Sequence, residues 1–149
     1  MSFIQLWRWG FPAPISLIGF VFASFIRASG GQIEKHGIAW EASDGAASRL
    51  LWLFNPWANI NAITLGHVIL ARDPLTAAHL RTHEQVHVRQ YERWGFIFPL
   101  AYVMASVLAF ARGADAYRDN VFEIEAFAAG GLNLETAVDR SRILRAPRQ

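Results

Sequence analysis

The chain contains no cysteine, which excludes disulfide bonds and thiolate metal ligands. Charge is also sparse: 14 basic and 12 acidic residues give a formal net charge of +2, and no nucleic-acid partner is expected. The 149 residues contain no P-loop, no dinucleotide-type glycine pattern and no internal repeat. Histidine and carboxylate side chains therefore remain as the candidate metal ligands.

Apolar residues, in contrast, are abundant. They make up 53% of the sequence, which includes six tryptophans and eleven phenylalanines. Two uncharged segments, 11–26 and 96–111, account for much of this excess, and arginines flank both. As straight helices each would be about 24 Å long, which is short for a hydrocarbon core of about 30 Å. Core helices, interfacial helices and short tilted spans all remain open for both segments.

The strongest motif is H-E-x-x-H, formed by His83, Glu84 and His87. The stretch 75–94 contains no proline or glycine and carries apolar residues at helical spacing, so a helix is expected over 77–94. On this helix the two histidines lie one turn apart and project toward a single ion. Glu84 is turned off that axis, where a carboxylate can serve as general base and acid.

A third ligand is needed, because catalytic zinc usually takes three protein ligands and leaves a fourth position to water. Glu123 and Glu125 stand two residues apart in an apolar stretch downstream. A helix would turn them about 200° apart, so only one of the two can face the metal ion.

With this second segment, the sequence resembles the gluzincins, a clan of metallopeptidases with two histidines on one helix and a glutamate on another. The resemblance covers about residues 32–131 and implies that Glu123 is the third zinc ligand. Many relatives have an aspartate four residues later, where this chain has Phe127, so the carboxylate that usually orients a ligand histidine is missing. Three acidic residues could take its place: Asp115, Asp119 and Glu125.

The stretch 62–71 is rich in aliphatic and β-branched residues and is expected to form a strand. In gluzincins such a strand borders the cleft and pairs its free edge with an extended peptide, so Gly66 and His67 are candidates for substrate binding. A fourth zinc contact and a purely structural role remain alternatives for His67. A hairpin is expected over 32–42, with its turn at Gly37.

The sequence suggests roles for four further residues. Tyr117 is the catalytic candidate for donating a hydrogen bond to the oxyanion of the transition state, with Arg118 as a second candidate. Gln90 extends the motif to H-E-x-x-H-x-x-Q, and both a solvated position and a packing role are open for it. Thr76 is placed to cap the histidine helix at its start.

Together these features predict a small α+β, zincin-like domain with a short β-sheet, a histidine helix, a glutamate helix and an N-terminal hydrophobic helix. Residues 1–31 are expected to anchor the protein in a membrane or to lie at its interface, and an uncleaved anchor is favoured over a signal peptide. Residues 32–139 would form the metallopeptidase domain, and 140–149 a basic tail.

The expected activity is hydrolysis of peptide bonds with Zn2+ as cofactor, with His83, His87 and Glu123 as ligands and Glu84 as proton shuttle. The expected partners are a peptide or protein substrate and membrane lipid. Two alternatives remain: an inactive binding or scaffold protein of the same fold, and an integral-membrane protein with a chance motif. A single crossing by 96–111 would put the histidines and Glu123 on opposite sides of the membrane, so it excludes the metal site.

Overall fold

Two glycines, Gly37 and Gly66, lie in the turns of two β-hairpins. The structure is a computed structural model that describes residues 8–49, 51 and 61–131. The basic tail expected at 140–149 lies outside the described residues. The elements in chain order are α2 (Ala13–Ala28), β1 (Gln32–His36), β2 (Ala39–Ser43), α3 (Gly45–Ser48), β3 (Ala62–Leu65), β4 (Val68–Ala71), α4 (Pro74–Trp94), the 3-10 helix η2 (Gly95–Ile97), α5 (Phe98–Ala111) and α6 (Val121–Gly130).

The four strands form one mixed sheet in the order β1-β2-β4-β3, which confirms the expected α+β class. Strands β1 and β2 are the hairpin predicted from Gly37, and β2 pairs with β4 in parallel. The single strand expected over 62–71 is wrong, because β3 and β4 pair antiparallel around Gly66. Gly66 has φ +63°, which favours glycine, so the chain reverses there despite its aliphatic flanks.

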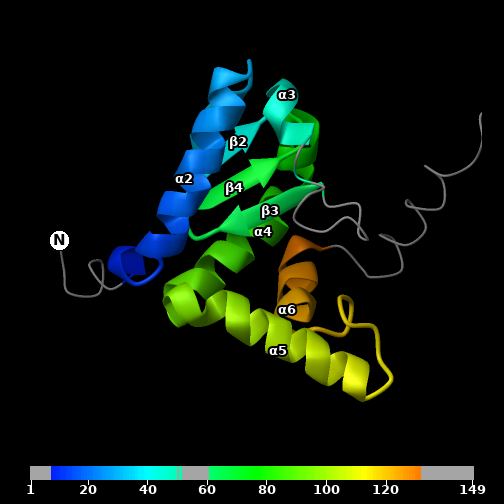
Figure 1. Cartoon of the computed structure of the whole chain (residues 1–149). Coiled ribbons are helices and arrows are strands. Elements are labelled where there is room, and N and C mark those ends of the chain that lie inside the picture. Colours follow the sequence, from blue (N-terminus) through cyan, green and yellow to red (C-terminus); the bar gives the residue numbers. More distant parts are fainter. Residues whose placement is uncertain (1–7, 50, 52–60, 132–149) are drawn as a thin grey trace, which may run out of the picture.

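The sheet is covered on both faces, by α2 on one side and α4 on the other (Figure 1). Val68 and Leu70 of β4 pack with Ala23 of α2, whereas Ile69 points the opposite way and packs with Val88 of α4. This alternation is the two-residue period of a strand buried on both faces.

Helix α2 approaches the β3–β4 hairpin through small residues. A Cβ atom at Gly19 would lie 2.7 Å from Val68 Cβ and 2.9 Å from the carbonyl oxygen of Leu65. The helix from the expected N-terminal anchor segment is therefore packed directly on the sheet.

Helix α4 contains the predicted histidine helix and begins three residues earlier than expected. Its N-cap is Asp73 and not Thr76, since a carboxylate oxygen of Asp73 accepts the backbone N–H of Thr76 at 2.8 Å. The ionised carboxylate also suits the positive end of the helix dipole. Helix α4 ends at Trp94, and its C-cap is Gly95, which has φ +61°. Helix α5 begins at Phe98 and has Pro99 in its first turn. The break expected at Gly95 and Pro99 is therefore confirmed.

The chain returns from α5 toward α4 through residues 112–120, which lead into α6. Asn120 is fully buried, and its side-chain amide donates to the carbonyl oxygen of Tyr102 at 3.1 Å and to Ser106 Oγ at 2.8 Å. Its side-chain oxygen accepts the backbone N–H of Phe122 and so caps α6. One asparagine thus fastens the start of α6 to the side of α5.

Helix α5 itself is largely uncovered. Among its residues only Phe98 and Ala109 are buried. Within the described residues, the helical run Pro74–Ala111 is long and apolar enough to cross a membrane by length and composition, with a window of mean hydropathy 1.8 that is 17% buried. Runs of this kind occur in membrane proteins and also in the cores of soluble proteins.

Candidate metal centre

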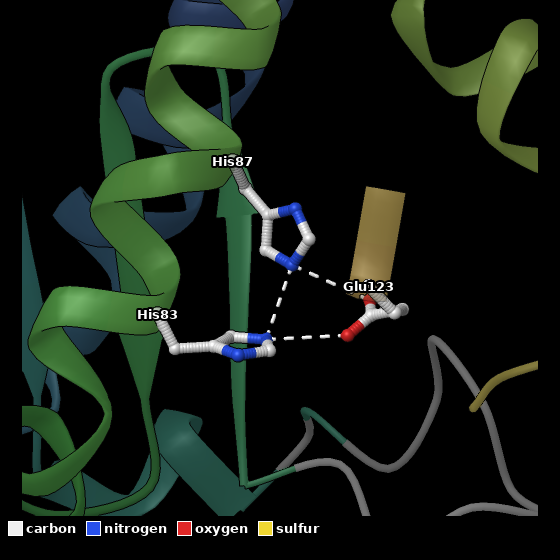
Figure 2. A group of neighbouring side chains, drawn as sticks. All are labelled: His83, His87 and Glu123. Atoms are coloured by element: carbon white, nitrogen blue, oxygen red, sulfur yellow. Dashed lines mark hydrogen bonds and ion pairs between the residues drawn. The ribbon is translucent and has the colours of Figure 1, made fainter. Parts of the chain in front are cut away.

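Two helices bring the three predicted ligands together. His83 and His87 project from one face of α4, and Glu123 comes from the first turn of α6 (Figure 2). All three are buried, and their candidate ligand atoms lie within 4.8 Å of one another. This buried group could hold a metal ion.

The two imidazole nitrogens are spaced like ligands of a tetrahedral ion, and each oxygen of Glu123 lies close to one of them. The two imidazole Nε2 atoms are 3.2 Å apart, His83 Nε2 is 3.3 Å from Glu123 Oε2, and His87 Nε2 is 3.3 Å from Glu123 Oε1. Donors at bond lengths of about 2.0–2.2 Å around a tetrahedral zinc ion are about 3.3–3.6 Å apart. Glu123 Oε2 is also buried, and apart from the 3.3 Å contact with His83 it has no hydrogen-bond partner among the described residues.

The carboxylate of Glu123 sets the electrostatics of the group. Burial alone would lower the pKa of His87, but the contact with Glu123 and the negative charges of Glu84 and Glu123 raise it to about 9. Burial acts in the opposite sense on the carboxyl group, and its contacts with both histidines hold the pKa of Glu123 well below its usual range. A proton on His87 therefore balances the carboxylate in the metal-free protein.

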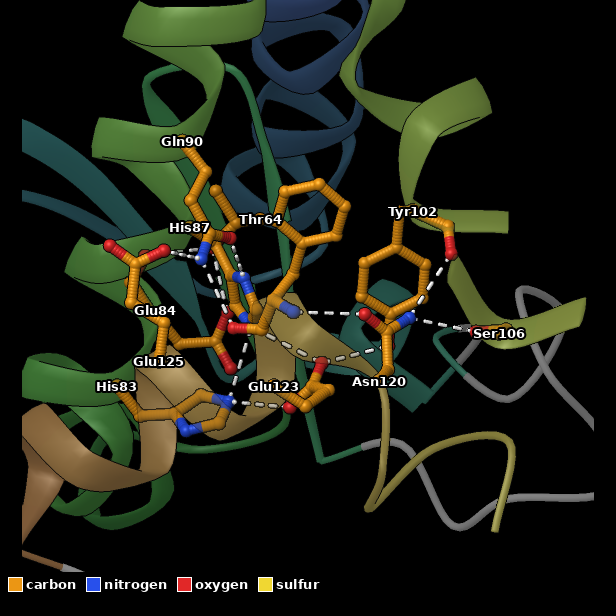
Figure 3. A network of polar contacts seen from close by, with 11 residues as sticks. Thr64, His83, Glu84, His87, Gln90, Tyr102, Ser106, Asn120, Glu123 and Glu125 are labelled. Atoms are coloured by element: carbon orange, nitrogen blue, oxygen red, sulfur yellow. Dashed lines mark hydrogen bonds and ion pairs between the residues drawn. The ribbon is translucent and has the colours of Figure 1, made fainter. Parts of the chain in front are cut away.

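Glu84 lies beside the ligands and is buried. The hydroxyl of Thr64 in β3 donates to Glu84 Oε2 at 2.7 Å, as Figure 3 shows. That bond occupies one carboxylate oxygen and leaves the other for a proton. Sequence reasoning missed Thr64 because a threonine in a strand is an ordinary strand-forming residue.

Tyr102 is a second residue that sequence reasoning missed. Its hydroxyl donates to Glu123 Oε1 at 2.7 Å, so α5 holds one oxygen of this candidate ligand while Oε2 faces His83. The signal in the sequence is the hydroxyl of a tyrosine in a segment whose other polar side chain is Ser106, a pattern that is also typical of interfacial tyrosines.

Gln90 is buried on α4 and contacts His87. Its side-chain oxygen is 2.8 Å from His87 Nδ1, and its side-chain nitrogen donates to Glu125 Oε2 at 2.8 Å (Figure 3). Of the two roles left open for Gln90, the solvated one is wrong.

The other acidic candidates lie elsewhere. Asp115 and Asp119 accept backbone N–H groups within their own loop. Phe127, at the place of the aspartate found in many gluzincins, packs its ring against His83 with centroids 4.7 Å apart. His83 is thus oriented by an aromatic contact and His87 by the polar contact with Gln90.

Tyr117 lies at the border of the group. Its ring makes an edge contact with Phe127, and 51% of its surface is exposed. Burial around its hydroxyl and the negative charges of Glu123 and Glu84 raise the pKa of Tyr117, so the hydroxyl stays protonated and able to donate. Its catalytic role stays a prediction, as does that of Arg118, whose backbone N–H bonds to Asp115 Oδ1.

Gly66 and His67 form the turn between β3 and β4, which contacts both α2 and the last part of α4. A Cβ atom at Gly66 would lie 2.2 Å from Ser16 Oγ. The fully buried ring of His67 stacks on Trp9 with centroids 3.9 Å apart, and its Nε2 is 3.5 Å from Glu92 Oε1. Burial lowers the pKa of His67 despite that carboxylate. Substrate binding by these two residues stays a prediction.

Comparison of the chain with protein-family models, with curated proteins and with solved structures found no match. The chemistry of the site therefore rests on the residues themselves.

Proposed function

We propose that this protein is a zinc-dependent hydrolase of peptide bonds with a zincin-like fold. In this proposal His83, His87 and Glu123 bind one Zn2+ ion. The observation that carries the proposal is the convergence of His83 Nε2, His87 Nε2 and the buried carboxylate of Glu123, whose two oxygens each lie 3.3 Å from one of these nitrogens. The H-E-x-x-H motif supports it, because it supplies the general base as well as two ligands.

Zinc bound there would supply Lewis acidity toward the scissile carbonyl group. Glu84 accepts the proton of the attacking water and passes it to the leaving amine nitrogen, while Thr64 keeps its carboxylate in place. Tyr102 holds Glu123 in position, and Tyr117 is the candidate donor to the oxyanion. His83 and His87 act as neutral ligands, so the proton on His87 leaves when the metal binds.

The substrate would be an extended peptide segment. Strand β3 is at the edge of the sheet and pairs only with β4 among the described strands. An extended peptide can add to such an edge through backbone hydrogen bonds. Because Thr64 of β3 touches Glu84, a peptide on this edge would run past the general base.

The protein would act at a membrane surface. Helix α5 exposes a stripe of apolar side chains at helical spacing: Leu100, Val103, Met104, Val107 and Leu108. Helix α2 exposes a second set: Leu17, Ile18, Val21, Phe22 and Phe25. Apolar faces of this extent mark an interaction with lipid or protein. Exposed Arg27 and Arg112 end the two helices, as in segments that lie in an anionic headgroup region.

The first test is metal content. The detergent-solubilised parent should contain about one zinc per chain by elemental mass spectrometry, and His87→Ala and Glu123→Ala should lose it. His79→Ala is the matched control, since His79 is an exposed histidine on the same helix. A reconstituted parent without zinc would refute the proposal.

The second test separates the enzyme from an inactive scaffold of the same fold. Glu84→Gln should keep its zinc but hydrolyse quenched fluorescent peptides at least about 100-fold more slowly, because the base is lost and the ligands are not. A zinc-loaded parent that cleaves no peptide in such a library would favour the scaffold alternative.

A further inference from the structure

Gln90 connects the two helices that carry the metal ligands. It is completely buried, its side-chain oxygen lies 2.8 Å from His87 Nδ1, and its side-chain nitrogen donates both to the carbonyl oxygen of Phe122 at 3.0 Å and to Glu125 Oε2 at 2.8 Å. Phe122 and Glu125 flank Glu123 on α6. Both hydrogens of the amide nitrogen are therefore used by α6.

These partners fix the orientation of the amide group. A backbone carbonyl and an ionised carboxylate can only accept hydrogen bonds, so the nitrogen of Gln90 must face them. The oxygen of Gln90 must then face His87, and an amide oxygen can only accept. His87 Nδ1 consequently carries a hydrogen, and in the neutral ring Nε2 is left with its lone pair.

This tautomer leaves the lone pair of His87 on Nε2, the ring nitrogen that faces the other two candidate ligands. His87 Nε2 is the nitrogen that lies 3.2 Å from His83 Nε2 and 3.3 Å from Glu123 Oε1. A ligand histidine usually donates its other N–H to a carboxylate or carbonyl group that orients the ring. Gln90 occupies that place here, and Glu125, which also pairs with Arg93, anchors the far end of its amide.

We propose that Gln90 and Glu125 form a relay that holds His87 as an Nε2 ligand and keeps α4 and α6 at the separation that the metal ion requires. This inference rests on the proposed metal site. The relay acts on His87, whereas Phe127 packs against the other histidine, His83. Gln90 and Glu125 are positioning residues, since neither touches the substrate or the ion.

Zinc affinity tests the relay independently of activity. Gln90→Leu keeps most of the side-chain volume and removes the acceptor, and loss of a partner of this kind weakens metal binding by about 10- to 100-fold. Gln85→Leu is the matched control, because Gln85 is on the same helix but donates to the carbonyl oxygen of His36, outside the site. It should bind zinc within about threefold of the parent.

A second pair of variants tests whether the two residues act together. Glu125→Ala should weaken zinc binding in the parent but cause no further loss in Gln90→Leu, since the relay is already broken there. Equal losses in both backgrounds would mean that Glu125 acts separately from Gln90 and would overturn the relay.

Nitrogen-15 spectra of the imidazole rings give a readout that needs no variant to fold. In the zinc-loaded parent, His87 should show a protonated Nδ1 and a metal-bound Nε2. The opposite assignment, or unchanged zinc affinity in Gln90→Leu, would overturn the inference. A parent that binds no zinc at all would instead refute the proposed function, so the two failures are distinguishable.

Discussion

Lipid binding by α5 can be tested at a single residue. Leu100 is 65% exposed on the apolar stripe of this helix. Covering a whole leucine side chain contributes about 1.5–3 kcal/mol, so covering the exposed part of Leu100 with lipid contributes about 1–2 kcal/mol. Leu100→Asp removes that contribution and brings a carboxylate to the lipid. The partition coefficient should fall at least about 5- to 30-fold.

The assay is flotation of the full chain with vesicles of phosphatidylcholine and phosphatidylglycerol. Leu75→Asp is the control, because Leu75 is even more exposed but lies in the first turn of α4, about 30 Å along that helix from α5. It should bind vesicles as the parent does. Equal losses in the two variants, or a parent that does not float, would show that α5 is not the lipid-binding surface.

Three further predictions concern the site and the fold. Tyr102→Phe removes the donor to Glu123 Oε1 and should weaken zinc binding about 10-fold, measured by chelator competition, without unfolding the protein. Zinc affinity should tighten about tenfold per pH unit from pH 7 and become independent of pH near pH 9. The reason is that below the raised pKa of His87, about 9, a proton on this ring competes with the metal. Calorimetry of zinc binding at pH 7 should detect the release of about one proton. Gly66→Ala should lower the melting temperature more than Gly113→Ala, since both glycines have positive φ but only Gly66 meets neighbouring atoms.

The sequence was most informative where a local rule operates. The helical spacing of His83 and His87, the helix around them and the glycine turn of the first hairpin all follow from periods and turn preferences within a few residues, and the structure has them. Gly66 marks the split of 62–71 into two strands, but the aliphatic residues on both sides of it resemble one continuous strand.

The residues missed at the site are those whose partners are distant in sequence. Thr64 bonds to Glu84 across 20 positions, and Tyr102 reaches Glu123 across 21. Nothing local to these residues signals such contacts, because side-chain hydrogen bonds of this kind appear only once helices and sheet are packed. The proximity of Glu123 to the two histidines depends on how α5 and residues 112–120 bring the chain back to α4. In the sequence, only the family resemblance indicated that Glu123 lies near the histidines.

The geometry of α5 reconciles the apolar surface with the metal site. The helix is about 21 Å long, which is short for a bilayer. The returning segment 112–120 is fastened to its side by Asn120, so Asp115 and Asp119 would enter hydrocarbon if α5 crossed the membrane. An orientation in the membrane plane keeps the charged segment in water and the leucine stripe in lipid. Tyr102, on that same helix, binds Glu123, so the metal site would then lie within about one helix diameter, 10–12 Å, of the lipid. Peptide segments close to the membrane surface are the substrates that such a site would reach.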